Sequence, residues 1–293
     1  MAASSLNQLH SDFIEDLKSK GRSQSTIIAY GKDLEQVIEF LGNKSKTAPT
    51  EVALEDLEEF KADLGKQDYT PKSISRKINS IRTFFKYLYG QNMISENPAE
   101  KLSHPKFETK PPRVLTEMEY RALRDVSRTD VRLYSIVELL LQTGIRIGEL
   151  TRLKIDDVKT TKDGKLKYLD IEAFGSHPER KVPLNQSANK ALDEYLKVRP
   201  KANDNTIFVT KTGNPLLVRN IRTSIDRAFE KAGIKNAKVN DLRNTFIAHH
   251  LANGVSLVTV SKLVGHKRLS TTEKYLDLIK KEENGTQQKL EAL

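Results

Sequence analysis

Four side chains late in this chain could together carry out chemistry on a phosphodiester. They are Arg146, Arg243, His266 and Tyr275, and they occur in that order. Two guanidiniums can hold both non-bridging oxygens of a phosphate and stabilise the charge of a pentacoordinate transition state. A phenol has a pKa of about 10 and is a poor nucleophile unless nearby cations favour its anion. The set therefore predicts a site in which Tyr275 attacks a phosphate held by the two arginines.

Each of these residues taken alone also has an ordinary structural explanation. Either arginine could cap a helix or lie on the surface. His266 directly follows Gly265, where it could cap a helix end. The hydroxyls of residues 270–272 could cap a short helix that carries Tyr275. The order and spacing of the set, rather than any single member, favour the chemical interpretation.

Composition and charge indicate a folded protein whose second half is basic. The chain has 293 residues, enough for about two domains, with 37% hydrophobic and 30% charged residues. Residues 1–105 hold 14 Lys and Arg against 15 Asp and Glu, and the remaining residues hold 35 against 24. A basic half beside a neutral one indicates either a polyanion partner or a solvated basic surface.

Cysteine usage and hydropathy exclude several classes of protein. The chain has no cysteine, which excludes disulfides, thiol catalysis and zinc sites with cysteine ligands, and fits a reducing compartment. No run of about 18 apolar residues occurs, so no membrane span is expected. The first residues lack the basic and apolar regions of a secretory signal. We therefore expect a cytoplasmic protein.

The pattern of hydrophobic residues predicts a mainly α protein with one small β-sheet. Residues 1–98 have helical periodicity, 99–112 form a proline-rich linker, and 113–293 combine helical patterns with two candidate strands. Ser25 is the predicted N-cap of a helix over 26–41, and Thr116 with Glu119 predicts a capping box. The other predicted helices begin near residues 9 and 71 or cover 133–141, 188–196, 218–232, 242–252, 257–263 and 287–293, and the strands cover 166–174 and begin at 181.

The helix predicted to start at Pro71 has an apolar face and basic residues elsewhere around it. Ile74, Ile78 and Ile81 are among the apolar residues and are expected to lie in the core. The basic residues are either solvated surface or contacts to the backbone of a nucleic acid. The candidates for DNA binding are Lys72, Arg76, Lys77 and Arg82.

The ordered segments resemble the tyrosine recombinase, or phage integrase, family, and in particular its compact Xer-like branch. The second half resembles the family at residues 143–150, 241–245, 263–266 and 270–275. The first half resembles the family's core-binding domain at Ser25-Thr26, Tyr30, Asp33-Leu34, Ser73–Tyr87 and Asn97-Pro98. The resemblance implies an N-terminal helical, SAM-like core-binding domain that binds DNA, and an α+β catalytic domain with a C-terminal tail.

The resemblance also implies a role for each of the chemical residues. Tyr275 would become linked to a DNA 3′-phosphate and free a 5′-hydroxyl. Arg146 and Arg243 would clamp the phosphate, and His266 matches the histidine of the family's last segment. Glu149 matches an acidic position that often supports the first arginine. Such enzymes need no metal and no other cofactor, because the phosphotyrosine bond retains the energy that religation requires.

The substrate implied by the resemblance is double-stranded DNA with inverted half-sites. The chain would form a homo-tetramer in the synaptic complex and exchange strands through a Holliday junction, in a resolution, integration or excision reaction that could involve accessory proteins. The tail from residue 282 to 293 would either dock on a neighbouring subunit or be disordered.

Two positions depart from the family pattern, and both affect proton transfer. Three residues before Arg243 the family usually has a histidine, whereas this chain has Asn240, which cannot act as an acid or base near neutral pH. The family's hairpin lysine is thought to protonate the leaving 5′-oxygen, and its place falls at residues 175–176. His177 and Lys181 are the nearest substitutes as general acid, and the sequence prefers neither.

Two alternatives to a recombinase remain at this point. An architectural DNA-binding protein of the same fold, with weak or no strand cleavage, is favoured by Asn240 and the missing lysine and disfavoured by Tyr275. A topoisomerase of related chemistry is disfavoured because the N-terminal helices and the tail resemble those of recombinases.

Overall fold

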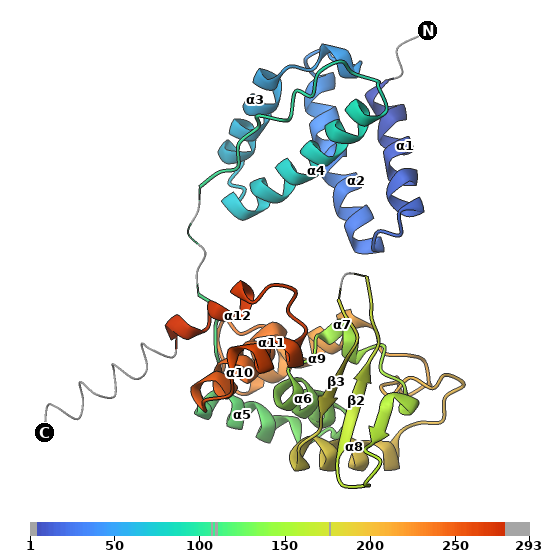
Figure 1. Ribbon diagram of the computed structural model, residues 1–293, viewed down its shortest axis with the longest axis vertical. Helices are drawn as coiled ribbons and strands as arrows, with labels where there is room; N and C mark the ends of the chain where they lie inside the picture. The colour runs from blue at the N-terminus through green and yellow to red at the C-terminus, as the bar shows by residue number, and fades with distance from the viewer. Residues whose placement is uncertain (1–4, 107, 109–110, 176, 279–293) are drawn as a thin grey trace, which may run out of the picture. The chain divides into compact units, whose positions relative to one another are not determined.

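The computed structural model describes residues 5–106, 108, 111–175 and 177–278. The chain divides into two compact units, Met1–Thr109 and Lys110–Leu293, each with its own core (Figure 1). This division falls within the predicted linker, 99–112. Ala99 and Leu102 are nevertheless buried in the core of the first unit. The first unit therefore extends beyond residue 98.

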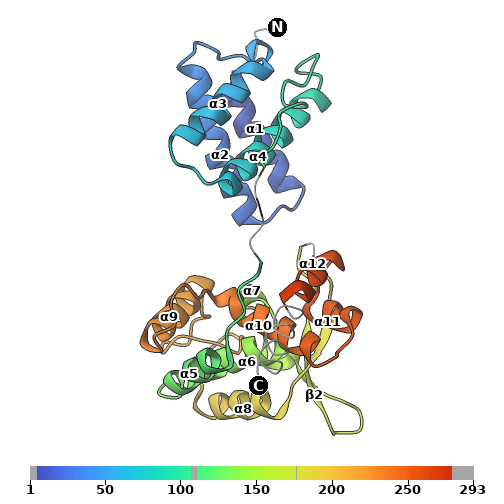
Figure 2. The same ribbon diagram turned by 90° about the vertical axis from the view of Figure 1, so that its left-hand side faces the viewer.

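Four α-helices account for most of the first unit (Figure 2). They are α1 (Leu6–Ser19), α2 (Gln24–Gly42), α3 (Leu54–Lys66) and α4 (Pro71–Gly90), with a short 3₁₀-helix, η1 (Pro49–Glu51), before α3. Helix α4 begins at Pro71 as predicted, because a proline in the first turn gives up no helical hydrogen bond. The N-cap of α2 is Ser23, whose hydroxyl accepts from the Thr26 amide, and the prediction of Ser25 was wrong.

A buried ion pair joins α2 to α4. Asp33 is 1% exposed and accepts hydrogen bonds from the Lys77 ammonium at 3.1 Å, from the Ser80 hydroxyl at 2.9 Å and from Arg76. Lys77 is 3% exposed and also donates to Gln36. A buried carboxylate needs a counter-charge, and Lys77 supplies it. Lys77 is thus a buried partner of Asp33, and it is not one of the exposed basic residues that the sequence predicts for α4.

The second unit consists of helices around one small sheet (Figure 1). The helices are α5 (Glu117–Ser127), α6 (Val131–Thr143), α7 (Ile147–Leu150), α8 (Gln186–Val198), α9 (Val218–Lys231), α10 (Val239–Ala252), α11 (Leu257–Val264) and α12 (Ser270–Glu273), with a 3₁₀-helix, η2 (Ile155–Asp157), after α7. Strands β1 (Val158–Thr160), β2 (Lys167–Ile171) and β3 (Arg180–Pro183) form an antiparallel sheet in the order β1-β2-β3.

The prediction of a mainly α protein with a small sheet is confirmed. The capping box of Thr116 and Glu119 is present at the start of α5. Strand β2 is shorter than the predicted 166–174, since it ends at Ile171 and Phe174 only bridges to His177. The hydrophobic pattern does not predict β1, α7 or α12, because segments of three or four residues hold too little periodicity. The helix predicted for 287–293 lies outside the described residues.

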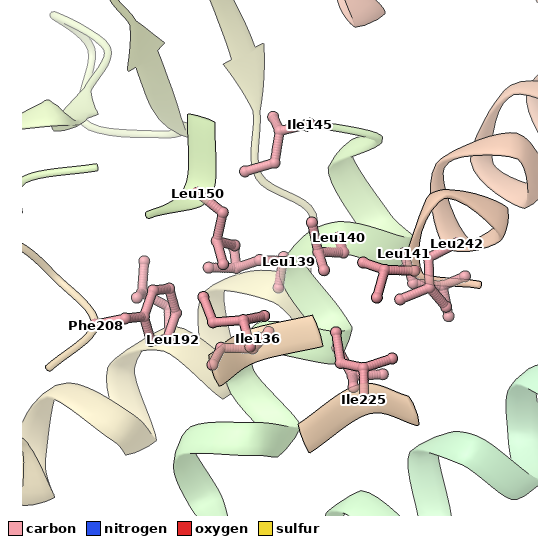
Figure 3. Packing of buried hydrophobic residues seen from close by; sticks show 14 of the residues in the cluster. Ile136, Leu139, Leu140, Leu141, Ile145, Leu150, Leu192, Phe208, Ile225 and Leu242 are labelled. Carbon is pink, nitrogen blue, oxygen red and sulfur yellow. The ribbon is translucent and has the colours of Figure 1, made fainter. Parts of the chain in front are cut away.

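Helix α6 passes through the core of the second unit (Figure 3). Its residues Ile136, Leu139 and Leu140 are at most 2% exposed. They share the core with Ile145, Leu150, Leu192, Phe208, Ile225 and Leu242. Burial of each large apolar side chain contributes about 1.5–3 kcal/mol, so the C-terminal end of α6, where Arg146 follows, is firmly placed. Within the described ranges, no helix combines the length and apolarity needed to cross a membrane.

We expect Asp33→Ala to destabilise the first unit by about 3 kcal/mol, because loss of one partner of a buried pair leaves Lys77 charged and uncompensated. Urea denaturation followed by circular dichroism measures the change in the free energy of unfolding. Lys72→Ala, at an exposed position of the same helix as Lys77, is the control and should change stability by no more than about 0.5 kcal/mol. Equal stability of Asp33→Ala and the unmodified chain would contradict this role of the pair.

Candidate active site

The site is built around the C-terminal end of α11. The last carbonyls of a helix have no partner within the helix and lie at the negative end of its dipole. Here three arginines donate to them: Arg180 Nε to Leu263 O at 2.7 Å, Arg243 Nη2 to Val264 O at 2.6 Å, and Arg146 Nη2 to Gly265 O at 3.0 Å. Arginines far apart in the sequence therefore meet at three consecutive carbonyls.

A glycine turn directs Arg146 towards this place. Gly144 ends α6 with φ of 62°, a left-handed conformation that favours glycine. A Cβ atom there would lie 2.4 Å from the ring of Phe246, so the position also requires the absence of a side chain. Arg146 then precedes α7 as its N-cap residue. Its backbone N–H and its Nη1 donate to the carboxylate of Glu149 at 2.8 and 3.0 Å.

The carboxylate of Glu149 joins two of the arginines. It is buried, and besides Arg146 it accepts from Arg180 Nη1 at 3.0 Å and Nη2 at 2.7 Å. Burial opposes ionisation of Glu149, but the hydrogen bonds from Arg180 and from the Arg146 amide outweigh it and lower the pKa to about 2. Glu149 is therefore ionised at neutral pH, as the resemblance implies for a residue that supports the first arginine.

Arg243, in α10, is buried without an acidic partner. It is 5% exposed and donates to the carbonyls of Gly144 and Val264. No ion pair joins it to a carboxylate of any residue that the structure describes. Burial, and then repulsion by Arg146, lower the pKa of Arg243 to about 9, which keeps it charged at neutral pH. A charged group that has lost its hydration and lacks a counter-ion favours the binding of an anion.

His266 lies beside the arginines and is neutral at physiological pH. Its Nδ1 is 2.8 Å from the hydroxyl of Thr272 in α12, a residue with no exposed surface. Burial, followed by the positive charges of Arg243 and Arg146, lowers the pKa of His266 to about 4. The C-cap of α11 is Gly265, which has φ of 67°, so the alternative explanation of His266 as a helix cap does not hold.

Tyr275 follows α12 and is held by a hydrogen bond. It is 6% exposed, and its hydroxyl donates to Asn244 Oδ1 at 2.8 Å. Burial raises the pKa of Tyr275, and the charge of Arg243 opposes this rise. Asn240 Nδ2 lies 3.2 Å from the same Asn244 oxygen. The predicted residues Asn240 and Tyr275 are therefore joined through Asn244, which the sequence analysis missed.

The two candidates for a general acid lie on different sides of the hairpin. Lys181 is exposed, pairs with Asp170 across the sheet and has its Nζ 5.2 Å from the ring centroid of Tyr168. Because side chains alternate along a strand, Lys181 faces away from the side on which Arg180 binds Glu149. Burial, and then the charge of Arg146, lower the pKa of His177. Its Nδ1 is buried and has no hydrogen-bond partner among the described residues. Residue 176, one of the two positions at which the family's hairpin lysine falls, lies outside the described residues.

The candidate DNA-binding residues of α4 belong to the other unit. Lys72, Arg76 and Arg82 are exposed. Arg76 also pairs with Asp33, and Arg82 Nη2 donates to Glu100 O at 3.3 Å. Over the described ranges, no group of three or more His, Asp or Glu side chains could hold a metal ion.

Arg180 is a further residue of the site that was not predicted from the sequence. Its signal was available in β3, where Arg180 and the buried Val182 alternate with the exposed residues Lys181 and Pro183. An arginine on the buried face of a strand requires an acidic or carbonyl partner. The identity of that partner, Glu149, depends on the tertiary fold.

Comparisons with known proteins agree over most of the chain. The phage integrase family matches residues 113–282, and the phage integrase N-terminal SAM-like domain matches 11–92. The chain is 32% identical to the tyrosine recombinase XerC of Bacillus pumilus, over 92% of this chain and 91% of the relative. It is 31% identical to the tyrosine recombinase XerD of Listeria innocua, over 94% of this chain and 95% of the relative. A solved lambda integrase tetramer bound to a Holliday junction has a TM-score of 0.72 at 18% identity, over 91% of this chain and 78% of that chain.

The low pKa of His266 predicts a loss of stability in acid. The folded pKa of about 4 lies below the ordinary histidine pKa of 6.5, so the unfolded chain binds the proton first as the pH falls. The contribution of neutral His266 to the free energy of unfolding is complete above about pH 6.5 and is lost towards pH 4. Between pH 7.5 and 5, the unmodified chain should lose about 1–2 kcal/mol more than His266→Gln.

Urea denaturation at the two pH values measures this difference. His249→Gln, at an exposed position in the same unit, is the control and should lose as much stability as the unmodified chain. If His266→Gln loses as much stability between the two pH values as the control does, the lowered pKa of His266 is not the cause of the loss.

Proposed function

Because the chain belongs to the phage integrase family of tyrosine recombinases, we propose that Tyr275 attacks a DNA phosphodiester held by Arg146 and Arg243. The observation that carries this proposal is the buried guanidinium of Arg243, which has carbonyl partners but no carboxylate among the described residues. Its charge reaches Tyr275, since it opposes the rise in the pKa of that phenol. Phosphate is the anion whose shape suits the fork of an arginine.

The proposed reaction replaces one phosphoester by another. The phenol of Tyr275 loses its proton, its oxygen forms a bond to phosphorus, and the bond from phosphorus to the 5′-oxygen breaks. The 5′-oxygen takes a proton and leaves as a hydroxyl, while the protein stays bonded to the 3′-phosphate. Attack by a 5′-hydroxyl of another strand reverses these changes and completes strand exchange. No outside source of energy is required, because each step conserves the number of phosphoester bonds.

Arg146, Arg243 and His266 bind the phosphate in this proposal, together with Asn240. Arg146 and Arg243 each have N–H donors beyond those used in their contacts within the protein, and these donors can form charge-assisted hydrogen bonds with phosphate oxygens. His266 is neutral, and its Nε2 forms no hydrogen bond with the part of the chain that is described. If Nδ1 accepts from Thr272, then Nε2 carries the proton and can donate to a phosphate oxygen. These donors stabilise the charge that develops in the transition state.

Tyr275 has to leave Asn244 before it can react. A buried phenol with a raised pKa is a weak nucleophile. One hydrogen bond contributes only about 0.5–1.5 kcal/mol net, so a phosphate next to Arg243 can displace it. Asn240 remains beside Asn244, and we assign it a hydrogen bond to the phosphate rather than a transfer of protons.

For protonation of the leaving oxygen, we favour His177 over Lys181. The charge of Arg146 contributes to the lowered pKa of His177, which supports this choice, whereas Lys181 lies over Tyr168 on the opposite face of β3. A phosphate bound at Arg146 would bring a negative charge near His177 and favour its protonated form. General acid catalysis contributes about 10² to 10⁴-fold.

At the level of DNA, we propose site-specific strand exchange between two duplex sites with inverted half-sites. A homo-tetramer would act through a Holliday junction, which is the species bound by the lambda integrase tetramer of the same fold. The core-binding domain would comprise residues 1–98 and the segment up to Leu102 that packs on them, with Lys72, Arg76 and Arg82 on phosphates. The rest of the predicted linker, 99–112, and the catalytic domain at 113–293 would follow. We propose resolution, integration or excision as the outcome of this exchange, with accessory proteins as partners. The protein would act in the cytoplasm, at the nucleoid.

A second candidate function is an architectural DNA-binding protein that cleaves weakly. Asn240 in place of a histidine, and the orientation of Lys181 away from Arg180, favour it. The convergence of three arginines beside Tyr275 disfavours it. Binding of DNA alone would not require a buried guanidinium, because exposed lysines and arginines suffice for non-specific affinity.

We expect the chain to form a covalent adduct with a suicide DNA substrate, nicked near the crossover so that the freed strand diffuses away. Denaturing gel electrophoresis detects the adduct. Tyr275→Phe should bind the same DNA and form none, because it lacks the nucleophilic oxygen. Tight binding without an adduct by the unmodified chain would favour the architectural function instead.

Arg243→Ala or Arg146→Ala should slow adduct formation by about 10³-fold, because each removes charge stabilisation in the transition state. The Kd for the same DNA should change by no more than a few-fold, since many other phosphate contacts remain. Single-turnover cleavage and gel-shift titration at one salt concentration measure the two effects. Equal losses in cleavage and binding would show that these arginines act only as part of the basic surface.

A further inference from the structure

Arg180 brings a third guanidinium to the site, and its contacts differ from those of the two clamp arginines. Its side chain is 7% exposed. Its Nε donates to Leu263 O, and both of its terminal nitrogens donate to the two oxygens of Glu149. We infer that Arg180 is a positioning residue, which fixes Glu149 so that Glu149 holds Arg146 ready for phosphate. This inference rests on the proposed function.

The hydrogen bonds of Glu149 show how this positioning works. Each of its oxygens accepts one bond from Arg146 and one from Arg180: Oε1 at 3.0 Å from both, and Oε2 at 2.8 Å from the Arg146 amide and 2.7 Å from Arg180. A carboxylate has about four such acceptor positions. All are occupied, so the carboxylate plane cannot rotate without breaking a bond. The terminal torsion of a glutamate side chain is broad. Without Arg180, this torsion of Glu149 would be restrained only by the hydrogen bonds from Arg146.

The charge of Arg180 is as important as its geometry. Glu149 and Arg146 alone would form a neutral pair, and a neutral pair attracts a phosphate weakly. Arg180 balances the carboxylate, so that the charge of Arg146 remains available to an incoming anion. Its charge also reaches the rest of the site, since it contributes to the lowered pKa values of Arg243 and His266.

Arg180 also links the hairpin to the helix end on which the site is built. It lies in β3, and its Nε binds Leu263 at the end of α11 at 2.7 Å. A Cβ atom on Gly265 would lie 3.0 Å from Arg180 Nη1, so the guanidinium packs directly on the turn before His266. A shift of β3 would therefore move Glu149, and with it Arg146.

The fork of arginine is required here. A lysine has one charged nitrogen and could not bind both oxygens of Glu149 and the carbonyl of Leu263 at once. We therefore expect Arg180→Lys to recover little of the activity lost in Arg180→Gln.

The experiment measures the single-turnover rate of adduct formation on the suicide substrate at saturating DNA, with Kd measured in parallel. Arg180→Gln should cleave about 10- to 100-fold more slowly than the unmodified chain, with Kd changed by no more than about twofold. Arg199→Gln is the matched control. Arg199 also donates to backbone carbonyls of the second unit, those of Asp204, Thr206 and Ile207, but lies outside the site. Its rate should equal that of the unmodified chain.

A double-mutant cycle with Glu149→Gln separates positioning from a merely structural role. If Arg180 acts through Glu149, the double variant should cleave no more slowly than the slower single variant. Losses that multiply would overturn the inference, as would unchanged cleavage by a folded Arg180→Gln. The double variant leaves no buried carboxylate without a counter-charge. If Arg180→Gln does not fold, the cleavage rates of the double variant and of Arg180→Lys are compared with that of Glu149→Gln instead. An unmodified chain that forms no adduct would instead overturn the proposed function.

Discussion

The hydrogen bonds between three arginines and the last carbonyls of α11 are the interaction on which the rest of the site depends. A helix end leaves these carbonyls without partners, and in a buried place they must be satisfied. Arg146, Arg180 and Arg243 satisfy them from three separate elements. Because the helix ends at Gly265, the chain turns there and places His266 beside the arginines. The same feature thus completes a helix and assembles a cationic site.

This assembly costs folding energy that its own contacts do not return. Like charges are brought together in a desolvated place, and the pKa values of Arg243 and His266 are lowered first by burial and then by repulsion from neighbouring arginines. The core around α6 holds the elements in place against it. Local rules of folding are broken in this way mainly at functional sites, where the unfavourable charge is what binds a ligand. The excess of cations is therefore better explained by an anionic substrate than by stability.

Sequence patterns predict those features that local physics determines, and they fail where distant residues decide. The apolar stripe of α4 and the capping box at Thr116 depend on neighbours within a few residues, and both are present. Lys77 could not be assigned to the core, because its counter-charge, Asp33, lies on another helix. The alternation in β3 places Arg180 on the same face as Val182 but does not identify its partner, and Asn244 has ordinary surroundings in the sequence. They acquire a role only when the fold brings Glu149 to one and Tyr275 to the other.

The charges of the site also explain why two clamp arginines alone would be insufficient. Arg146, Arg180 and Arg243 are three cations, whereas Glu149 and one phosphodiester are two anions. One positive charge therefore remains when the substrate is bound, and it is available to the phenolate of Tyr275 and to the additional charge of the transition state. In the proposed reaction, removal of Arg180 would leave the bound site neutral, and the charge of Arg243, which opposes the raised pKa of Tyr275, would then be offset by the bound phosphate. In the proposed reaction, reactivity of the tyrosine would thus depend on an arginine whose own hydrogen bonds go to Glu149 and to the end of α11.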